Sequence, residues 1–433
     1  MRHSTFMIAA PNSESGKSTI TIGLLRALYK RGIQIQSFKC GPDYIDPKLH
    51  QVASHQTAIN LDLFMNSEER IKEIFARYDA FSESSIVEGV MGLFDGYDRD
   101  MGSSAHLARV LGLPILLVVT PKSMAYSVAP LLYGIKHFQK DLNIVGVLFN
   151  KVNSETHYKY LLQACEDAGV RCIGKIPTDK QLELPSRYLG LETEDASKLE
   201  HYAEQSARLV EEHISIDDLL TLTEAPKSAA PNPLPKLSQL RIAVAMDEAF
   251  SFIYPENIKV LEQFGSVTYF SPMYDEQLPE SDFVYLPGGY PELYLPRLSG
   301  NSSMLRSVAN YAQSGRPMLA EGGGMLYLGQ ALIDSEGRRY PLAGVLEQEG
   351  TMISPKLTLG YRQFAIDGIE VRGHEFHYSR IIESLPSIVQ QYSAHQVAVP
   401  TPLVRYSNCF ATYTHLSFTS ELIRHFINQS TDL

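Results

Sequence analysis

The sequence is poor in the features that mark membrane, secreted and nucleic-acid-binding proteins. Its 433 residues include no tryptophan, which by itself excludes nothing. No apolar run is long enough to cross a bilayer, so we expect no membrane partner. The formal net charge of −11 argues against general binding to nucleic acid. The four cysteines lack the spacing of a metal site; they are Cys40, Cys165, Cys172 and Cys409.

Two of these absences bear on where the protein works. Scattered cysteines are typical of free thiols in a reducing compartment. Met1 to Ser4 lead directly into an apolar segment, so we expect no signal peptide. Both observations predict a cytoplasmic protein. The content of 44% hydrophobic and 20% charged residues is ordinary for a globular chain with substantial cores.

The first half of the chain alternates between segments with the pattern of strands and segments with the pattern of helices. The expected strands are short, continuous apolar runs, as in buried parallel strands. This alternation predicts a parallel sheet covered by helices on both faces. We expect strands at 5–10, 33–38, 85–90, 114–120 and 143–149, and helices at 17–31, 67–78, 103–112, 124–139 and 155–168.

The composition shifts at 221–239, which is rich in proline, alanine and serine and shows no periodicity. Such a segment is typical of a linker. A strand pattern restarts at Arg241–Ala245 and the alternation resumes. The chain therefore predicts two doubly wound α/β domains in series, 1–220 and 240–433. In the second domain we expect helices at 256–264, 302–314 and 324–332, and strands at 266–270, 283–286 and 317–320.

A phosphate-binding loop is predicted at Ala10–Thr19, between an apolar strand and an amphipathic helix. Free N–H groups and the positive end of the helix dipole favour a phosphate at such a helix start. Pro11 stands where the usual pattern has its first glycine, and an ordinary strand–helix turn is the alternative. We interpret the loop as an ATP site, in which Lys17 reaches the terminal phosphates and Ser18 holds magnesium. The expected nucleotide-binding residues are Ser15, Gly16, Lys17, Ser18 and Thr19.

Acidic residues follow the second and third predicted strands, in 39–47 and 88–96. The carboxyl ends of parallel strands lie beside the phosphate loop in such a sheet. We therefore expect Asp46 and Glu88 to join Ser18 around Mg²⁺, which prefers oxygen ligands. The alternative is that these acids only cap helices or turns.

Three more residues are candidates for the same site. The loop that carries Asp43 and Tyr44 should face the γ-phosphate, so we expect both near the reacting group of the substrate. Asn150 ends the fifth predicted strand and is a candidate for reading the nucleotide base. A plain turn is the alternative for Asn150.

Long motifs occur along the whole chain: APNSESGKST, FKCGPDYIDP, EGVMGLFDG, GSSAHLARVLGLPILLVV, FNKVNSETHY, AMDEAFSFIYPENI, YFSPMYDEQLP, YLPGGYPELY, AEGGGMLYLG, LGYRQ, RGHEFHYSR and YTHLSF. These segments resemble the cobyrinate a,c-diamide synthase family nearly end to end. The resemblance implies a dethiobiotin-synthetase-like ATPase domain with a P-loop NTPase fold (1–220) and a class I glutamine amidotransferase-like domain (240–433). It implies ATP, Mg²⁺ and glutamine as reagents, and a corrin-type tetrapyrrole whose a and c acetate side chains become amides. A related branch acts on sirohydrochlorin or sirohaem-type tetrapyrroles.

The chemistry that the resemblance implies explains two domains. A carboxylate is a poor electrophile toward ammonia, and transfer of the γ-phosphate gives an acyl phosphate with a good leaving group. The second domain of the family normally makes ammonia from glutamine through a cysteine thioester. The resemblance leaves the oligomeric state open, with a homodimer as the candidate.

One position departs from the family. Its turn reads Ala-Glu-Cys-Gly-Gly, whereas this chain has Gly322 in place of the nucleophile. His415 matches the family's base, and Ser417 replaces a second usual histidine. Glycine adopts the backbone angles of such a turn without the strain that a side chain causes. We therefore expect the domain to fold and glutamine hydrolysis to be lost. The nitrogen source is then free ammonia or ammonia made by another protein. Two interpretations of Gly322 stay open, a natural variant and a deliberate replacement of the cysteine.

Two alternatives stay open. Switch ATPases that place septa or partition DNA share the expected first fold, but they carry an extra lysine where this chain has Asn12. The second domain could also be a pseudo-amidotransferase that only binds substrate or a partner. His374, His377 and Tyr378 lie in a predicted strand without the helical spacing of a zinc site, which favours a structural or substrate-contacting role.

Overall fold

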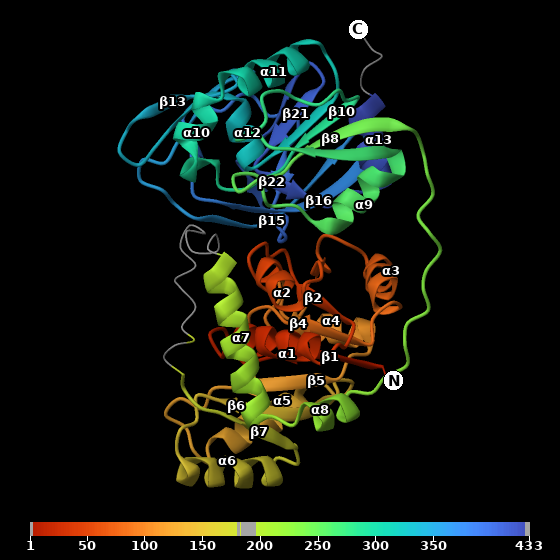
Figure 1. Ribbon diagram of the computed structural model, residues 1–433, viewed down its shortest axis with the longest axis vertical. Helices are drawn as coiled ribbons and strands as arrows, with labels where there is room; N and C mark the ends of the chain where they lie inside the picture. Colours follow the sequence, from red (N-terminus) through yellow and green to blue (C-terminus); the bar gives the residue numbers. More distant parts are fainter. Residues whose placement is uncertain (1–2, 180–181, 183–195, 429–433) are drawn as a thin grey trace. The chain divides into compact units, whose positions relative to one another are not determined.

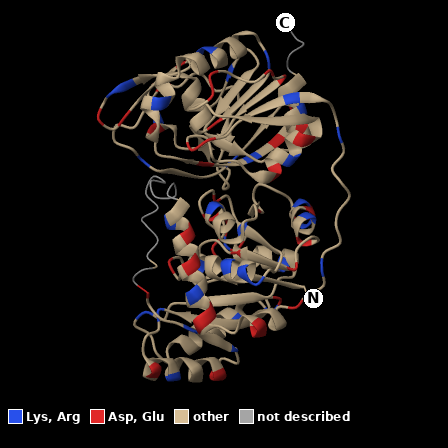
Figure 2. Ribbon diagram, viewed as in Figure 1, with Lys and Arg blue, Asp and Glu red and all other residues tan. Residues whose placement is uncertain are grey.

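The computed structural model describes residues 3–179, 182 and 196–428. The chain divides into two compact units, Met1–Asn232 and Pro233–Leu433 (Figure 1). The boundary lies inside the segment 221–239 that the composition marks as a linker. In the described ranges, no helix is both long and apolar enough to cross a membrane. Acidic and basic residues are interspersed along the helices of both units (Figure 2).

Unit 1 is built on a seven-stranded sheet in the order β3-β2-β4-β1-β5-β6-β7. Every pairing in it is parallel, as the alternation of strands and helices predicts. The chain places β2 and β3 on one side of β1, returns to insert β4 between β2 and β1, and continues with β5 to β7 on the other side. The strand order therefore reverses beside β1, the strand that precedes the phosphate loop. The strands are β1 (Ser4–Ala9), β2 (Ile35–Cys40), β3 (Ile59–Leu61), β4 (Ser84–Glu88), β5 (Ile115–Val119), β6 (Ile144–Asn150) and β7 (Cys172–Ile176).

Two hydrophobic cores cover the faces of this sheet. Strand β1 shows why, because successive side chains point to opposite faces. Phe6 and Ile8 enter the core formed with α1, α2, α7 and α8. Met7 and Ala9 enter the core formed with α3 to α6. The helices are α1 (Lys17–Lys30), α2 (Asp46–Ser54), α3 (Glu68–Asp79), α4 (Ser104–Leu111), α5 (Val128–Phe138), α6 (Glu155–Asp167), α7 (Ala196–His213) and α8 (Ile216–Leu222).

Unit 2 has a six-stranded sheet in the order β20-β21-β11-β10-β8-β9, parallel except for the edge strand β20. Two smaller sheets accompany it, β13-β12-β14-β17 and β19-β18-β15-β16-β22. The main strands are β8 (Leu240–Ala245), β9 (Gly265–Phe270), β10 (Phe283–Leu286), β11 (Met318–Glu321), β20 (Leu403–Tyr406) and β21 (Cys409–Thr412). The helices are α9 (Pro255–Phe264), α10 (Leu295–Gly300), α11 (Ser302–Gln313), α12 (Gly323–Leu328) and α13 (Ser420–Asn428), with a 3₁₀ turn η2 (Pro291–Leu293).

The strands of the smaller sheets complete unit 2. They are β12 (Gly329–Ile333), β13 (Arg339–Pro341), β14 (Leu346–Thr351), β15 (Thr358–Ile366), β16 (Ile369–His377), β17 (Arg380–Ile381), β18 (Gln391–Tyr392), β19 (Ala398–Val399) and β22 (Thr414–Leu416).

The prediction of a helix over 324–332 is wrong in its second half. Helix α12 ends at Leu328, and Gly329 begins strand β12, which pairs with β14. The pattern could not show this, because an apolar run of that length fits a buried helix and a buried strand equally well. The sequence reading also missed β3, β7, α2 and α7. Strand β7 was missed because Gly174 and Lys175 interrupt its apolar run.

Part of the expected linker is attached to unit 1. The N–H of Ala225 donates to the carbonyl of His3, and the N–H of Ser228 donates to Asp79 Oδ2 at 3.0 Å. Ser4 and Glu224 form an isolated antiparallel bridge. On the other side of the boundary, the N–H of Leu237 donates to Gln263 of α9.

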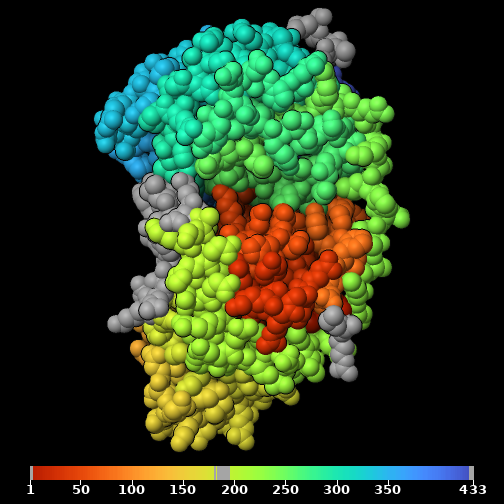
Figure 3. Space-filling view, in the orientation of Figure 1, coloured from red at the N-terminus to blue at the C-terminus, as the bar shows by residue number. Residues whose placement is uncertain are grey.

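Helix α7 packs directly on α1, and Figure 3 shows the two segments side by side. Gly23 makes this approach possible, because a Cβ at this position would lie 2.5 Å from the carbonyl oxygen of Ser206. It would also lie 2.6 Å from a methyl group of Val210. Any side chain on Gly23 must therefore push α7 away.

Gly23→Ala should destabilise the protein by separating α1 and α7. Gly134 in α5 is the matched control, because nothing lies within 4 Å of a Cβ added there. Gly134→Ala should stabilise the protein by roughly 0.5–1 kcal/mol, the usual gain of alanine over glycine in a helix. Thermal unfolding of the two full-length variants measures both effects, and equal shifts of the same sign would contradict this account of the packing.

Candidate functional site

The phosphate loop joins β1 to α1, and its last residue is forced to be glycine. Gly16 is the N-cap of α1 and has φ 89° and ψ 19°, in the left-handed region. A Cβ on Gly16 would lie 2.1 Å from the side-chain nitrogen of Asn150. Helix α1 begins directly after this turn, and the start of a helix is the local geometry that binds a phosphate.

Two neighbouring strand ends fix this loop. The carbonyl oxygen of Ser15 accepts hydrogen bonds from Thr120 Oγ1 and from Asn150 Nδ2, each at 3.0 Å. The Oδ1 of Asn150 accepts from the N–H of Lys151 at 3.0 Å. Asn150 also lines the cavity described below, but both ends of its amide are engaged, the nitrogen with the phosphate loop and the oxygen with Lys151. The structure thus gives Asn150 a positioning role, and reading the base stays a prediction.

Lys17 is mostly buried, at 8% exposure, and its side chain spans from α1 to the loop after β4. Its Nζ donates a hydrogen bond of 2.6 Å to the carbonyl of Met91. Met91 has φ 45°, an unusual backbone conformation for a residue with a side chain. The next residue of α1, Ser18, points to the acidic residues. Thr19 Oγ1 lies 2.8 Å from the hydroxyl of Tyr202 in α7.

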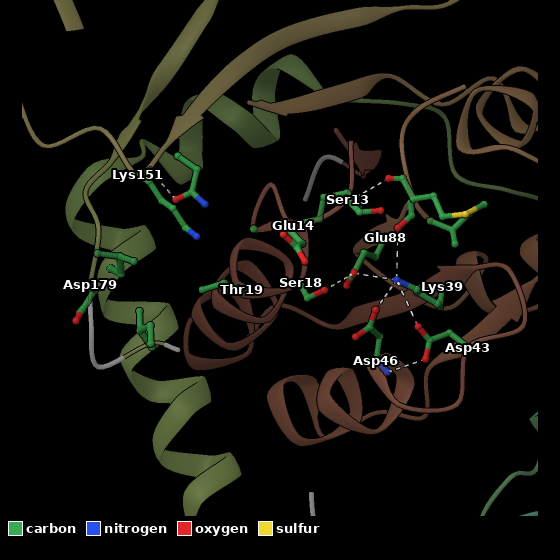
Figure 4. A pocket seen from close by; sticks show the side chains of 18 of the residues that line it. Ser13, Glu14, Ser18, Thr19, Lys39, Asp43, Asp46, Glu88, Lys151 and Asp179 are labelled. Atoms are coloured by element: carbon green, nitrogen blue, oxygen red, sulfur yellow. Dashed lines mark hydrogen bonds and ion pairs between the residues drawn. The ribbon is translucent and has the colours of Figure 1, made fainter. Parts of the chain in front are cut away.

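The three predicted metal-binding residues lie together, and a lysine joins them (Figure 4). Ser18 Oγ donates to Glu88 Oε1 at 2.8 Å. Lys39 Nζ donates to Asp46 Oδ2 at 2.5 Å and to Glu88 Oε1 at 2.9 Å. Lys39, Asp46 and Glu88 are exposed by 3%, 1% and 0%, so this is a buried ion cluster. The sequence reading did not single out Lys39.

Electrostatics keeps the cluster charged despite its burial. Burial disfavours the ammonium of Lys39, but Asp46 and Glu88 more than offset this and raise the pKa of Lys39. Burial likewise acts to raise the pKa of Glu88, but Lys39 and the bond from His50 hold that pKa well below its usual range. One ammonium faces two carboxylates, so the cluster keeps a net negative charge that suits a further cation.

The donor set fits Mg²⁺ bound together with a nucleotide. Ser18, Asp46 and Glu88 offer hydroxyl and carboxylate oxygens, the ligands that Mg²⁺ prefers. Within the part of the chain that the structure describes, no three His, Cys, Asp or Glu side chains converge on one point. The protein alone therefore offers a partial site, typical of magnesium that takes its other ligands from phosphates and water.

A cavity of about 830 Å³ opens over the phosphate loop and the ion cluster. Asp43 lies on its wall. Its Oδ1 accepts from the N–H groups of Ile45 and Asp46, while Oδ2 lies 3.9 Å from Lys39 Nζ. Tyr44, which was expected near the substrate, is buried at 8% exposure and is not among the described residues that line this cavity. The cavity is also lined by Lys151, Pro177, Thr178 and Asp179.

In unit 2, Gly322 lies on a sharp turn between β11 and α12, with φ 48° and ψ −111°. His415 in β22 lies against it, because a Cβ on Gly322 would be 2.7 Å from His415 Cε1 and 3.2 Å from Nε2. The structure therefore brings together the two residues that the sequence reading paired. Ser417 lies just after β22, where its N–H donates to the carbonyl of Arg372 at 3.0 Å.

Glu321 is buried beside this pair. It accepts from the hydroxyl of Tyr285 at 2.8 Å and from the N–H of Leu416 at 3.1 Å. Its Oε2 lies 3.9 Å from His415 Nδ1. Burial raises the pKa of Glu321, although its bond with His415 acts in the opposite direction. A histidine and a carboxylate thus remain in place beside a residue with no side chain.

Cys409 is not a substitute nucleophile. It pairs with Met318 at the start of β11, whereas Gly322 follows the last residue of that strand. At about 3.3 Å per residue, this separation is on the order of 10 Å. Burial also raises the pKa of the Cys409 thiol to about 12, so the reactive thiolate is scarce at neutral pH.

The histidines of strand β16 have structural contacts. Glu375 accepts from Thr401 Oγ1 at 2.6 Å, contacts His377 Nε2 at 2.7 Å and forms an ion pair with Arg362. The ring of His377 stacks on Tyr413 at 3.7 Å between centroids. His374 pairs with His415 across strands β16 and β22, and Tyr378 contacts the edge of Phe376.

Lys39→Met should leave two buried carboxylates without their counter-ion and cost about 3–5 kcal/mol of unfolding free energy near neutral pH. In the parent, the depressed pKa of Glu88 makes its contribution to stability present above its unfolded pKa and lost as the pH falls. In the variant, the lowering by Lys39 is removed and His50 alone of these two partners still opposes burial, so the pKa of Glu88 should rise and stability should be lost as the pH rises.

Urea unfolding of the full chain at about pH 5 and about pH 8 tests this, because the contribution of Glu88 in the parent should be the same at both pH values, whereas the variant should be less stable at the higher one. Lys72→Met is the control, because Lys72 is exposed on α3. It should change stability by no more than about 0.5 kcal/mol. A Lys39→Met variant as stable as the parent at both pH values would show that the ion cluster does not organise this site.

Comparison with known proteins agrees with both units. Residues 6–191 match the CobQ/CobB/MinD/ParA nucleotide binding domain, and residues 241–422 match the CobB/CobQ-like glutamine amidotransferase domain. The chain is 37% identical over 453 residues to cobyrinate a,c-diamide synthase of Caldanaerobacter subterraneus subsp. tengcongensis, covering 98% of each chain.

Two further relatives are similarly close. The chain is 37% identical over 436 residues to cobyrinate a,c-diamide synthase of Picrophilus torridus, covering 97% of each chain. It is 41% identical over 390 residues to hydrogenobyrinate a,c-diamide synthase of Brucella abortus biovar 1, covering 87% of this chain and 89% of the relative. The chain therefore belongs to the family of cobyrinate and hydrogenobyrinate a,c-diamide synthases, which are ATP-dependent amidating ligases.

Proposed function

We propose that this protein uses ATP to convert the a and c acetate side chains of a corrin-type tetrapyrrole into amides, with ammonia that its own second unit does not make. The observation that carries the ATP-dependent step is the convergence of Lys17, Ser18 and the buried cluster of Lys39, Asp46 and Glu88 at one end of the sheet. The names of the relatives support the choice of substrate.

In the proposed reaction, an oxygen of the acetate carboxylate forms a bond to the γ-phosphorus of ATP. The bond from that phosphorus to the bridging oxygen breaks, and ADP leaves with the electron pair. Lys17 and Lys39 supply positive charge as charge moves onto the phosphate oxygens. Mg²⁺, when bound by Ser18, Asp46 and Glu88, would supply further positive charge beside the phosphates.

Ammonia then attacks the carbonyl carbon of the acyl phosphate with its lone pair. The bond from carbon to the phosphate oxygen breaks, phosphate leaves with one of the original carboxylate oxygens, and the nitrogen loses a proton. Asp43 lies on the cavity wall with one carboxylate oxygen turned to Lys39, so it is the candidate for contacting the reacting acetate or the incoming ammonia.

Gly322 is the reason to propose an external nitrogen source. A thioester with glutamine requires a thiol at the turn after β11, and Gly322 has no side chain. His415 and Glu321 are held in place, but neither supplies the missing nucleophile.

Lys17→Ala should abolish amide formation without unfolding the protein. The substitution removes the ammonium group that is proposed to contact the terminal phosphates of ATP. The measurement is mass spectrometry of cobyrinate or hydrogenobyrinate incubated with the protein, ATP, Mg²⁺ and ammonium chloride. The parent should add two amides. Amidation by Lys17→Ala at the parent rate would contradict the proposal that this loop binds ATP.

Ammonium salts should support amidation, increasingly so as the pH rises toward the pKa of ammonium, whereas glutamine should not. Gly322→Cys should restore measurable release of glutamate from glutamine, because His415 already lies beside the new side chain. The gain should be modest, since the new Cβ would lie 2.7 Å from His415 Cε1 and the ring must move.

Gly322→Ala is the matched control, because it adds the same Cβ without a thiol. It should release no glutamate, which separates the chemistry of the thiol from the displacement of His415. Robust release of glutamate by the unaltered protein would mean that another residue is the nucleophile.

A further inference from the structure

His50 is a buried residue beside the proposed magnesium site that the reaction does not use directly. It lies in α2, one helical turn after Asp46, so both side chains share the face that meets Glu88. Its exposure is 0%, and its Nε2 lies 2.6 Å from Glu88 Oε2. Among the residues that the structure describes, no hydrogen-bond partner faces its Nδ1.

The two oxygens of Glu88 are thereby divided between different partners. Oε1 accepts from Ser18 and from Lys39, on the side of the phosphate loop. Oε2 lies against the ring of His50. An ionised carboxylate only accepts hydrogen bonds, so Nε2 must carry the proton of the imidazole and donate it.

This division bears on which cation the site prefers. Magnesium demands near-octahedral geometry with ligands at about 2.0–2.1 Å, whereas calcium takes six to eight oxygens and accepts both oxygens of one carboxylate. A Glu88 whose Oε2 is occupied by His50 offers a single oxygen to a cation beside Ser18. A Glu88 freed from His50 could rotate and offer both.

We propose that His50 is a positioning residue that limits Glu88 to one oxygen and so makes the site prefer Mg²⁺ over Ca²⁺. The proposal rests on the proposed function for the identity of the metal site, and it adds how the site selects its cation. Partners behind the primary ligands orient those ligands, and their loss typically weakens metal binding by about 10-fold to 100-fold.

Two variants separate the hydrogen bond from the volume of the ring. His50→Leu fills much of the space but donates nothing, so Glu88 Oε2 becomes available. His50→Gln has an amide N–H that reaches the same oxygen. The measurement uses the full chain with the β,γ-imido analogue of ATP and Mn²⁺, and follows by electron paramagnetic resonance how Mg²⁺ or Ca²⁺ displaces the Mn²⁺.

His50→Leu should shift the ratio of Mg²⁺ to Ca²⁺ affinity by about 10-fold toward calcium. His50→Gln should keep the ratio of the parent. A folded His50→Leu protein with the parent ratio would overturn the proposal, and so would an equal shift in both variants.

If His50→Leu does not fold, nitrogen NMR of the unaltered protein with ¹⁵N-labelled histidine keeps the test open. The ring of His50 should carry its proton on Nε2, both alone and with Mg²⁺ and the analogue. A proton on Nδ1 alone would overturn the proposal, because Nε2 could not then donate to Glu88.

Failure of the proposed function looks different. A protein that binds Mg²⁺ and the analogue with the expected selectivity but forms no amide would contradict the proposed reaction and leave the role of His50 intact. A parent protein that binds no Mn²⁺ with the analogue would overturn both.

Discussion

The buried ammonium of Lys39 is the contact on which the first site depends. Lys39 lies opposite Glu88 in the register of β2 and β4, so the pairing of the two strands itself brings the charges together. Asp46 completes the cluster from the first turn of α2. Burial would disfavour each charge alone, and the three persist because each has a partner. One cluster of charges therefore links the register of two strands, the start of α2 and the candidate site.

The same cluster explains why the site needs ligands to be complete. Lys39 already occupies part of the space between Asp46 and Glu88, and the remaining oxygens are too few to enclose a metal ion. A cation that arrives with nucleotide phosphates brings the missing ligands. Magnesium and ATP should thus bind as one unit.

The second unit, which matches a glutamine amidotransferase domain, has a buried histidine and a buried carboxylate beside Gly322, a residue without a side chain. Glu321 is held by Tyr285 and by the backbone of Leu416, and its neighbour His415 lies against Gly322. A φ of 48° with a ψ of −111° is a conformation that strains a residue with a side chain, by roughly 1–3 kcal/mol. Glycine relieves that strain, so Gly322 is compatible with the fold of the unit.

The sequence was sufficient to predict Ser18, Asp46 and Glu88 as neighbours, because residues at the ends of parallel strands meet at one edge.

Lys39 and His50 were missed for physical reasons. A lysine in a strand is usually solvated, and only the strand register shows that Lys39 is paired. His50 lies on a short helix that begins with Asp46 and Pro47, and the sequence analysis interpreted these two residues as part of a loop. The i, i+4 spacing of Asp46 and His50 was the available signal. Five of the seven strands of unit 1 (β1, β2, β4, β5 and β6) and their parallel sheet were predicted, because continuous apolar runs indicate buried strands. Strand β12 (Gly329–Ile333) was not predicted, since an apolar run of that length fits a helix and a strand equally well.

The most direct test of the account follows one oxygen atom. The substrate is prepared with ¹⁸O in its acetate carboxylates and incubated with the protein, ATP, Mg²⁺ and ammonium chloride, and the released phosphate is analysed by mass spectrometry. Activation of the acid by the γ-phosphate predicts one ¹⁸O atom in phosphate for each amide formed. Amide formation with unlabelled phosphate would contradict the account, because ATP would then be cleaved without activating the carboxylate.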